Sequence, residues 1–223
     1  MPPGYSNAIA VLRAGVQAVD DTLEEMRTIF LLVRHADHDW IGKAFAGRLP
    51  GVHLNANGRQ QAEALAGRLA GAGIAALYSS PLERALETVE PLAKRLGLPV
   101  TIRERLIEIG TGDWTEEPFD KLGPTARWKR FLNFRSSTNP PAGELMLEVQ
   151  ARMVTELEEL RERHPGETVA LFSHADVIRF GFAHYAGIAI DLAHRLEIRP
   201  ASVSRIALGA EDVRVLGLNE VGA

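Results

Sequence analysis

Short, continuous apolar runs alternate along the chain with segments whose apolar residues recur every three or four positions. The runs are Ile29–Val33, Ala75–Tyr78, Pro99–Ile102 and Val169–Phe172. Runs of this kind are typical of strands buried on both faces of a parallel sheet. Near the end of the chain, Ser202–Leu208 and Val213–Leu218 flank a turn-like stretch. We expect these last two segments to form a hairpin or two strands at a sheet edge.

Helical periodicity fills the gaps between the strands. Gly58–Ala70 places Ala62, Leu65, Ala66 and Leu69 on one face. A second helix is predicted over Pro81–Leu96, with Ser80 as its N-cap and Pro81 at its first position. Two further helices are predicted, over Glu144–Arg163 and Asp176–Tyr185. This alternation of strands and helices predicts a layered α/β fold with a mostly parallel sheet.

The 223 residues suffice for one substantial domain. Residues 1–27 are interpreted as an N-terminal helical extension and residues 28–223 as the α/β domain. Within the domain, residues 112–143 interrupt the rhythm with four prolines and a cluster of aromatic residues, and are interpreted as a lid-like insertion. Its aromatic residues are expected to form the core of the insertion rather than a stacking platform; they are Trp114, Trp128, Phe131 and Phe134.

Composition narrows the class of partner. The net charge of −4 gives no indication of nucleic acid or an anionic membrane as a partner. The absence of cysteine removes disulfides, thiolate metal sites and cysteine nucleophiles. No segment is long and apolar enough to span a bilayer, and the N-terminus lacks the order of a signal peptide. The expected location is the cytoplasm, and pairing of two copies is left open.

Chemically active side chains follow the predicted strands. Arg34 and His35 come directly after Ile29–Val33, and His174 comes just after Val169–Phe172. Arg84 and Glu108 follow the other two apolar runs. Ligands of open α/β sheets bind beyond the carboxyl ends of the strands. Each residue alone is more often structural or solvated, so the prediction of a site depends on their coincidence at one sheet edge.

The group makes chemical sense as a phosphate site. Guanidinium groups form bidentate hydrogen bonds with phosphate oxygens, and a neutral imidazole can accept a phosphoryl group. Positive charge from Arg34 and Arg84 should keep His35 neutral. Glu108 could give a proton to the leaving alcohol if burial or the bound phosphate raised its pKa.

The sequence His-Ala-Asp-His-Asp, residues 35–39, also admits other interpretations. It could contribute to a zinc or manganese site, but its spacing matches no hydrolase metal motif and Arg34 is a poor neighbour for a dication. We therefore predict no metal and no cofactor. His38 is a candidate substrate contact at the mouth of the pocket. Ser173 is not surrounded by the Gly-x-Ser-x-Gly elbow of a serine hydrolase.

The segment "LLVRHADHDW" resembles the Arg-His-Gly signature of the histidine phosphatase superfamily, which includes cofactor-dependent phosphoglycerate mutases. The resemblance extends from about residue 28 to residue 187. It continues in order through "GRLPGVHLNANGRQQAEALAGRL", "LYSSPLERALETVEPLAKRLGL", "RLIEIGTGDWTEEP", "PAGELMLEVQARM" and "VALFSHADVIR". It implies a three-layer α/β/α sandwich with a mostly parallel mixed sheet, as in phosphoglycerate mutases, and chemistry that needs no metal.

The resemblance also implies roles for individual residues. His35 is the nucleophile, Arg34 and Arg84 grip the phosphoryl group, His174 stabilises the transferred charge, and Glu108 is the proton donor. Several positions depart from the family pattern, among them His38, Gly110 and Thr111. Three further departures are Ala36 and Ala175, where glycine is usual, and Ile41, where asparagine commonly touches the phosphoryl group.

The function expected from these residues is hydrolysis of a small phosphorylated metabolite through a phosphohistidine intermediate. Two alternatives remain open. One is a phosphomutase of the phosphoglycerate mutase type. The other is a domain with weakened catalysis that binds a phosphorylated ligand or a protein.

Overall fold

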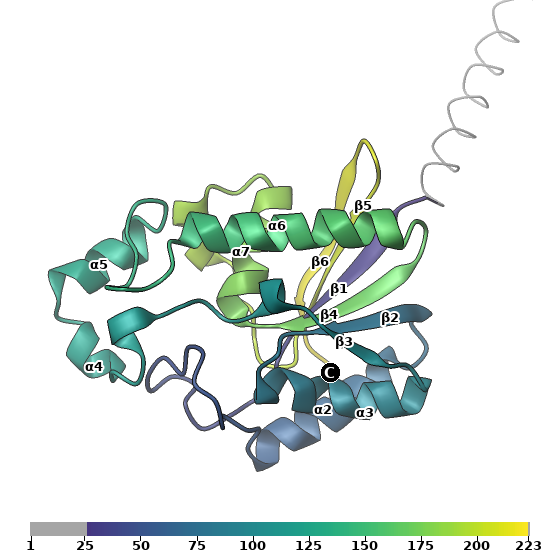
Figure 1. Ribbon diagram of the computed structural model, residues 1–223, viewed down its shortest axis with the longest axis horizontal. Coiled ribbons are helices and arrows are strands. Elements are labelled where there is room, and N and C mark those ends of the chain that lie inside the picture. The colour runs from purple at the N-terminus through teal and green to yellow at the C-terminus, as the bar shows by residue number, and fades with distance from the viewer. Residues whose placement is uncertain (1–25, 223) are drawn as a thin grey trace, which may run out of the picture.

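The computed structural model describes residues 26–222 (Figure 1). The N-terminal helical extension predicted for residues 1–27 lies almost entirely outside the described residues. In the described part the predicted α/β fold is confirmed. Its strands are β1 (Thr28–Arg34), β2 (Ile74–Ser79), β3 (Val100–Ile102), β4 (Thr168–Ser173), β5 (Val203–Leu208) and β6 (Val213–Glu220).

The six strands form one mixed sheet in the order β3-β2-β4-β1-β5-β6. Strands β3, β2, β4 and β1 are mutually parallel, whereas β5 runs antiparallel to β1 and to β6. The predicted hairpin at the sheet edge is therefore confirmed as β5 and β6. The central strand β1 is apolar from Ile29 to Val33, as expected for a strand with helices on both faces.

Helices cover both faces of this sheet (Figure 1). The main helices are α2 (Ala56–Leu69), α3 (Glu83–Leu96), α6 (Met146–Arg163) and α7 (Ala175–Tyr185). Helices α2 and α3 bury one core with the sheet residues Leu31, Val33 and Phe172. Helices α6 and α7 bury a second core on the opposite face, with Phe30, Leu32 and others. The result is the three-layer α/β/α sandwich.

The predicted N-terminus of the second helix is wrong. Helix α3 begins at Glu83 with Leu82 as its N-cap residue, not at Pro81 with Ser80 as cap. The hydroxyl of Ser80 instead lies 2.7 Å from Nε2 of His174, on the neighbouring strand end. A tertiary hydrogen bond thus holds a side chain whose local sequence favours a helix cap.

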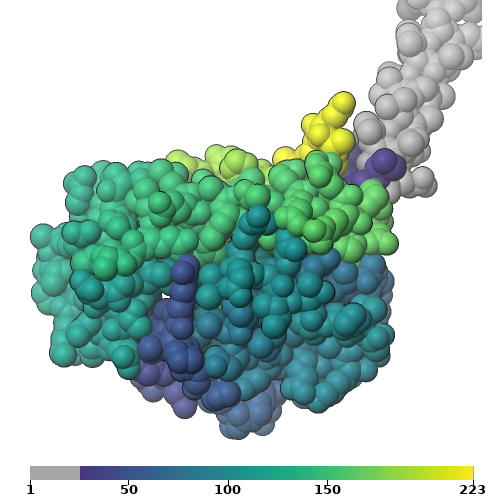
Figure 2. Space-filling model, in the orientation of Figure 1, coloured from purple at the N-terminus to yellow at the C-terminus, as the bar shows by residue number. Residues whose placement is uncertain are grey.

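Residues 112–143 carry the short helices α4 (Phe119–Leu122) and α5 (Ala126–Asn133). Trp114 and Phe131 are buried, and Trp128 packs against them, as expected for an insertion core. Phe134 is the exception, since it is half exposed after the last turn of α5, where the Arg130 guanidinium lies over its ring. Figure 2 shows this segment beside the loop after β1. Ala44 and Phe45 of that loop form isolated bridges with Pro118 and Thr115 of the segment.

Short 3₁₀ segments complete the described chain; they are η1 (Glu104–Leu106), η2 (Gly112–Trp114) and η3 (Ile190–Arg195). Among residues 26–222, no helix has the length and apolarity needed to cross a membrane.

Candidate active site

The ends of three adjacent strands meet at one point of the sheet edge. The N–H of His35, after β1, donates to the carbonyl of Ser173 at 2.9 Å, and the N–H of Ser80, after β2, donates to the carbonyl of Phe172 at 2.9 Å. These backbone bonds fix His35, His174 and Ser80 side by side in the order of their strands. The prediction that the strand ends bring the two histidines together is confirmed, with ring centroids 5.1 Å apart.

His35 presents a free lone pair to the site. Its Nδ1 lies 2.8 Å from the carbonyl oxygen of Ala36. Because a carbonyl oxygen can only accept, Nδ1 must carry the proton, and Nε2 is the unprotonated nitrogen. Burial, followed by the charges of Arg34 and Arg84, holds the pKa of His35 well below its ordinary value of 6.5. The imidazole is therefore neutral and suited to nucleophilic attack.

The two arginines supply hydrogen-bond donors that no group of the described chain uses. Arg84, on the first turn of α3, is almost completely buried, and Arg34 is the last residue of β1. One terminal nitrogen of each is held by a carbonyl, that of Ile198 for Arg34 and that of Gly47 for Arg84. Nε of Arg34 and both Nε and Nη1 of Arg84 are buried without a partner in residues 26–222. Unpaired buried charge of this kind is costly unless an anion completes it.

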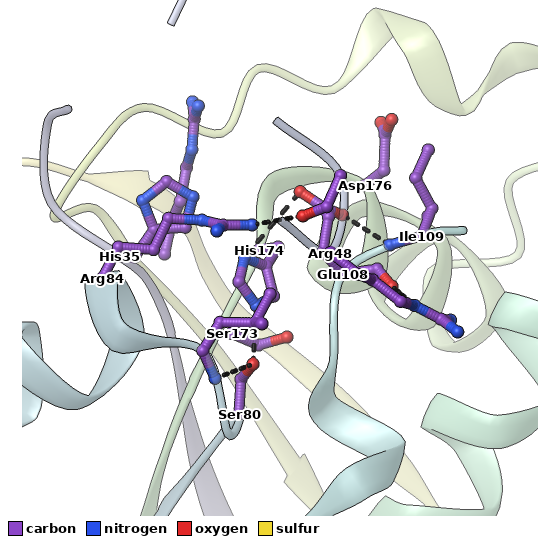
Figure 3. Close-up of polar contacts among 12 residues, drawn as sticks. His35, Arg48, Ser80, Arg84, Glu108, Ile109, Ser173, His174 and Asp176 are labelled. Atoms are coloured by element: carbon purple, nitrogen blue, oxygen red, sulfur yellow. Dashed lines mark hydrogen bonds and ion pairs between the residues drawn. The ribbon is translucent and has the colours of Figure 1, made fainter. Parts of the chain in front are cut away.

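His174 is held by Ser80. The N–H of Leu82 donates to the Ser80 oxygen, so the hydroxyl proton of Ser80 can be donated to Nε2 of His174. Nδ1 of His174 then carries a proton and is buried without a hydrogen-bond partner in the described chain. It lies 3.8 Å from Oε2 of Glu108 (Figure 3). His174 thus adds a further donor to the same anion-binding space.

Ser80→Ala tests this support. The variant should lower kcat about tenfold, because one hydrogen bond that fixes the tautomer of His174 is lost. Phosphate release under saturating substrate is the measurement, and the exposed Ser137→Ala is the matched control. Equal kcat for the two variants would show that His174 is oriented by packing alone.

Glu108 lies in the same site, and its pKa is raised. Burial raises it first and the charge of Asp176 second, against the opposing effect of Arg84, the Ile109 N–H and Arg34. Its Oε1 accepts a hydrogen bond from the N–H of Ile109 at 2.8 Å. A carboxyl group that keeps its proton above its ordinary pKa of 4.5 can serve as a general acid.

A support for Glu108 was not found from the sequence. The backbone carbonyl of Glu108 accepts from Nε of Arg48 at 2.8 Å and, more weakly, from Arg152. Glu144 pairs with both of these arginines and accepts from the N–H of Gly110. The members of this cluster are up to about a hundred residues apart, so no local pattern could have revealed it.

Residues 35–39 make contacts in two different places, the pocket and the start of α2. His38 lies over His35, with ring centroids 5.0 Å apart, and burial followed by the charges of Arg84 and Arg34 lowers its pKa to about 4. The Asp37 side chain accepts from Asn55 and Asn57, which ties the loop to the start of α2. That helix approaches so closely that a Cβ on Gly58 would meet the Asp37 carbonyl at 2.0 Å.

Three of the residues that depart from the family pattern lie in different surroundings. Ala36 is fully buried in the core under α2 and α3, and its N–H donates to Thr88. Its methyl group is therefore accommodated by the core. Ala175 and Ile41 both line the pocket, where Ile41 provides an apolar surface.

These groups surround a pocket of about 230 Å³. Its polar walls are Arg34, His35, His38, Arg84, Glu108, Asp176 and Arg179. The rest of the lining is Trp40, Ile41, Gly42, Ala44, Phe45, Ala46, Gly47, Phe119 and Ala175. A larger hollow of about 530 Å³ lies between α2 and α3. Its charged residues include the exposed His53 and its half-buried partner Glu87, so nothing there resembles a buried reaction centre.

His35, Glu108 and His174 also have ligand-type atoms within 4.8 Å of one another. A dication there would lie beside the guanidinium groups of Arg34 and Arg84, which repel it. The same donors fit an oxyanion without conflict.

Comparison with known proteins agrees with this geometry. The family model of the histidine phosphatase superfamily (branch 1) matches residues 30–221. Phosphoserine phosphatase 1 of Hydrogenobacter thermophilus is 31% identical over 196 residues, which cover 85% of this chain and 90% of that protein. A probable phosphoglycerate mutase, GpmB of Shigella boydii, is 30% identical over 177 residues, 78% of this chain and 82% of that protein.

Solved structures with the same fold include related proteins. YhfR of Bacillus stearothermophilus superimposes with a TM-score of 0.80 at 28% identity, covering 87% of this chain and 98% of that one. A mycobacterial glucosyl-3-phosphoglycerate phosphatase superimposes with a TM-score of 0.77 at 26% identity, covering 88% and 99%. The chain, whose relatives include phosphatases and mutases, belongs to branch 1 of the histidine phosphatase superfamily.

Proposed function

We propose that the protein is a phosphomonoester phosphatase that transfers the phosphoryl group of a small metabolite to His35 and then to water. The observation that carries this proposal is the set of buried, unpartnered nitrogen donors on Arg34, Arg84 and His174 around the lone pair of His35. Arg34 and Arg84 line, together with His35 and Glu108, a pocket of about 230 Å³, which suits a phosphoryl group and a small leaving group.

In the first half of the proposed reaction, Nε2 of His35 attacks phosphorus and the bond to the ester oxygen breaks. Arg34, Arg84 and His174 stabilise the charge on the transferring oxygens. Glu108 gives its proton to the leaving oxygen, which departs as the alcohol. The products of this step are the alcohol, phosphohistidine and an ionised Glu108.

In the second half, water enters in place of the alcohol. The Glu108 carboxylate takes a proton from this water, whose oxygen attacks phosphorus. The N–P bond breaks, inorganic phosphate leaves, and both His35 and Glu108 return to their starting protonation states. No metal takes part in these steps, so saturating EDTA should leave the rate of phosphate release unchanged.

The pH dependence follows from the two shifted groups. Activity should fall on the acid side as His35 takes a proton, at a pH well below 6.5 because its pKa is lowered. It should fall on the alkaline side as Glu108 loses its proton, at a pH above 4.5 because its pKa is raised. A profile of kcat/KM from pH 4 to 9 measures both limbs. A profile without an alkaline limb would contradict the role of Glu108, and an acid limb at or above pH 6.5 would contradict the lowered pKa of His35.

A phosphomutase would use the same first half, and the relatives include a probable phosphoglycerate mutase. It would return the phosphoryl group to another hydroxyl of the bound product. Incubation with a phosphorylated polyol separates the two: free phosphate supports the phosphatase, and a positional isomer without free phosphate supports the mutase. Binding of phosphomonoesters with neither product would favour the non-enzymatic alternative.

A further inference from the structure

Two charged residues in the pocket neither accept the phosphoryl group nor exchange a proton in the proposed reaction. Asp176 and Arg179 lie on the first turns of α7 and line the pocket together with Glu108. In Figure 3, Asp176 lies on the far side of Glu108 from His35. That is the side from which a leaving group would extend, because Glu108 must reach the leaving oxygen.

The guanidinium of Arg179 is already engaged. Its Nη1 pairs with Oδ1 of Asp176, and its Nε donates to the carbonyl of Leu196 at 3.0 Å. Arg135 approaches the same Asp176 oxygen from another side at 3.5 Å, and its own guanidinium lies over the Phe131 ring. Two of the three guanidinium nitrogens of Arg179 are therefore already engaged within the described chain.

Asp176 remains ionised in this setting. Burial would raise its pKa, but the charges of Arg179, Arg135 and Arg34 outweigh burial and hold the pKa below its ordinary value. The contacts with Arg135 and Arg179 both use Oδ1 of the carboxylate, and no hydrogen bond within residues 26–222 engages Oδ2. The carboxylate thus keeps an acceptor that a ligand can use.

The apolar wall of the pocket includes Trp40, Ile41, Phe45 and Phe119. A leaving group between this wall and Asp176 would meet a carboxylate acceptor and hydrophobic surface. A hydroxyl group can donate to that acceptor. A second carboxylate cannot donate to that acceptor, and it would be brought close to the negative charge of Asp176.

We propose that Asp176 is a specificity-determining residue, which selects phosphomonoesters of uncharged, hydroxyl-bearing alcohols over those whose alcohol carries a carboxylate. This inference rests on the proposed phosphatase function. It would separate the substrate of this chain from that of the phosphoserine phosphatase of Hydrogenobacter thermophilus, since phosphoserine carries a carboxylate.

The test uses glycerol 3-phosphate and 3-phosphoglycerate, which differ only in a hydroxymethyl group against a carboxylate. The wild-type protein should have a kcat/KM about tenfold or more higher for glycerol 3-phosphate. In Asp176→Asn this ratio should fall about tenfold, because Arg179 and Arg135 become available to the carboxylate. In Arg179→Gln the ratio should rise, since a positive charge is removed and Asp176 is left exposed.

The two variants are expected to change the ratio in opposite directions. A general loss of folding would instead lower kcat/KM for both substrates together and leave the ratio unchanged. Any effect of Asp176→Asn on the pKa of Glu108 also acts on both substrates and leaves their ratio unchanged. The exposed Asp113→Asn is the matched control and should keep the wild-type ratio.

p-Nitrophenyl phosphate serves as a reference substrate. Failure of the wild-type protein to release phosphate from any of the three substrates would remove the proposed function itself. Turnover with a wild-type preference for 3-phosphoglycerate, or with the same ratio in Asp176→Asn and Arg179→Gln as in the wild type, would overturn the specificity role alone.

Discussion

Replacement of His35 by alanine is expected to lower phosphate release by about 10⁴-fold or more, because the variant lacks the atom to which the phosphoryl group is transferred. The ring is nearly fully buried and its Nδ1 is fixed by the Ala36 carbonyl. A water molecule in the space left by the ring would have neither the lone pair of an imidazole nor its fixed position.

Rapid-quench labelling gives the sharper measurement. Wild-type protein mixed with a ³²P-labelled substrate should carry label that survives alkali and is lost in acid, as the N–P bond of phosphohistidine requires. His35→Ala should carry none, whereas His194→Ala, which changes an exposed histidine, should match the wild type. Label or turnover retained in His35→Ala would place the nucleophile elsewhere and end the proposed mechanism.

Replacement of Glu108 by glutamine should have an effect that depends on the leaving group. For an ordinary alkyl phosphate, kcat should fall about 10²- to 10⁴-fold, because glutamine cannot give a proton to the departing alkoxide. For p-nitrophenyl phosphate the loss should be less than about tenfold in the first half-reaction, since the phenolate leaves without a proton. Single-turnover burst kinetics with both substrates measures this difference.

The same variant should change the pH profile. The alkaline limb that Glu108 produces should disappear in Glu108→Gln, while the acid limb from His35 should remain. Glu104→Gln, on the exposed side of η1, is the control. An equal loss with both leaving groups would assign Glu108 a role in positioning and leave the proton donor to another group.

Much of the fold follows from local patterns. The run Ile29–Val33 and the four apolar positions of Gly58–Ala70 predicted β1 and α2 to within two residues, since burial on one or two faces leaves a period that the sequence displays directly. The beginning of α3 could not be predicted in this way. Ser80 has the chemistry of a cap, and only the approach of His174 from another strand shows why it is used otherwise.

Part of the candidate site could also be predicted from the sequence. His35, Arg34, Arg84, His174 and Glu108 were found because each follows an apolar run, and parallel strands bring such positions to one edge. Asp176 and Arg179 were not found, although their spacing of three on a helix was visible and compatible with an ion pair. Nothing in that spacing says that the pair faces the pocket.

The sequence by itself determined the family, the order of strands and helices along the chain, and the residue types available for phosphoryl transfer, because these depend on neighbours within a few positions. The tertiary structure alone decided which nitrogen of His35 is free, which donors of Arg34 and Arg84 lack partners, and that the pKa of Glu108 is raised. These properties depend on burial and on charges from distant segments, and burial exists only once the layers have packed.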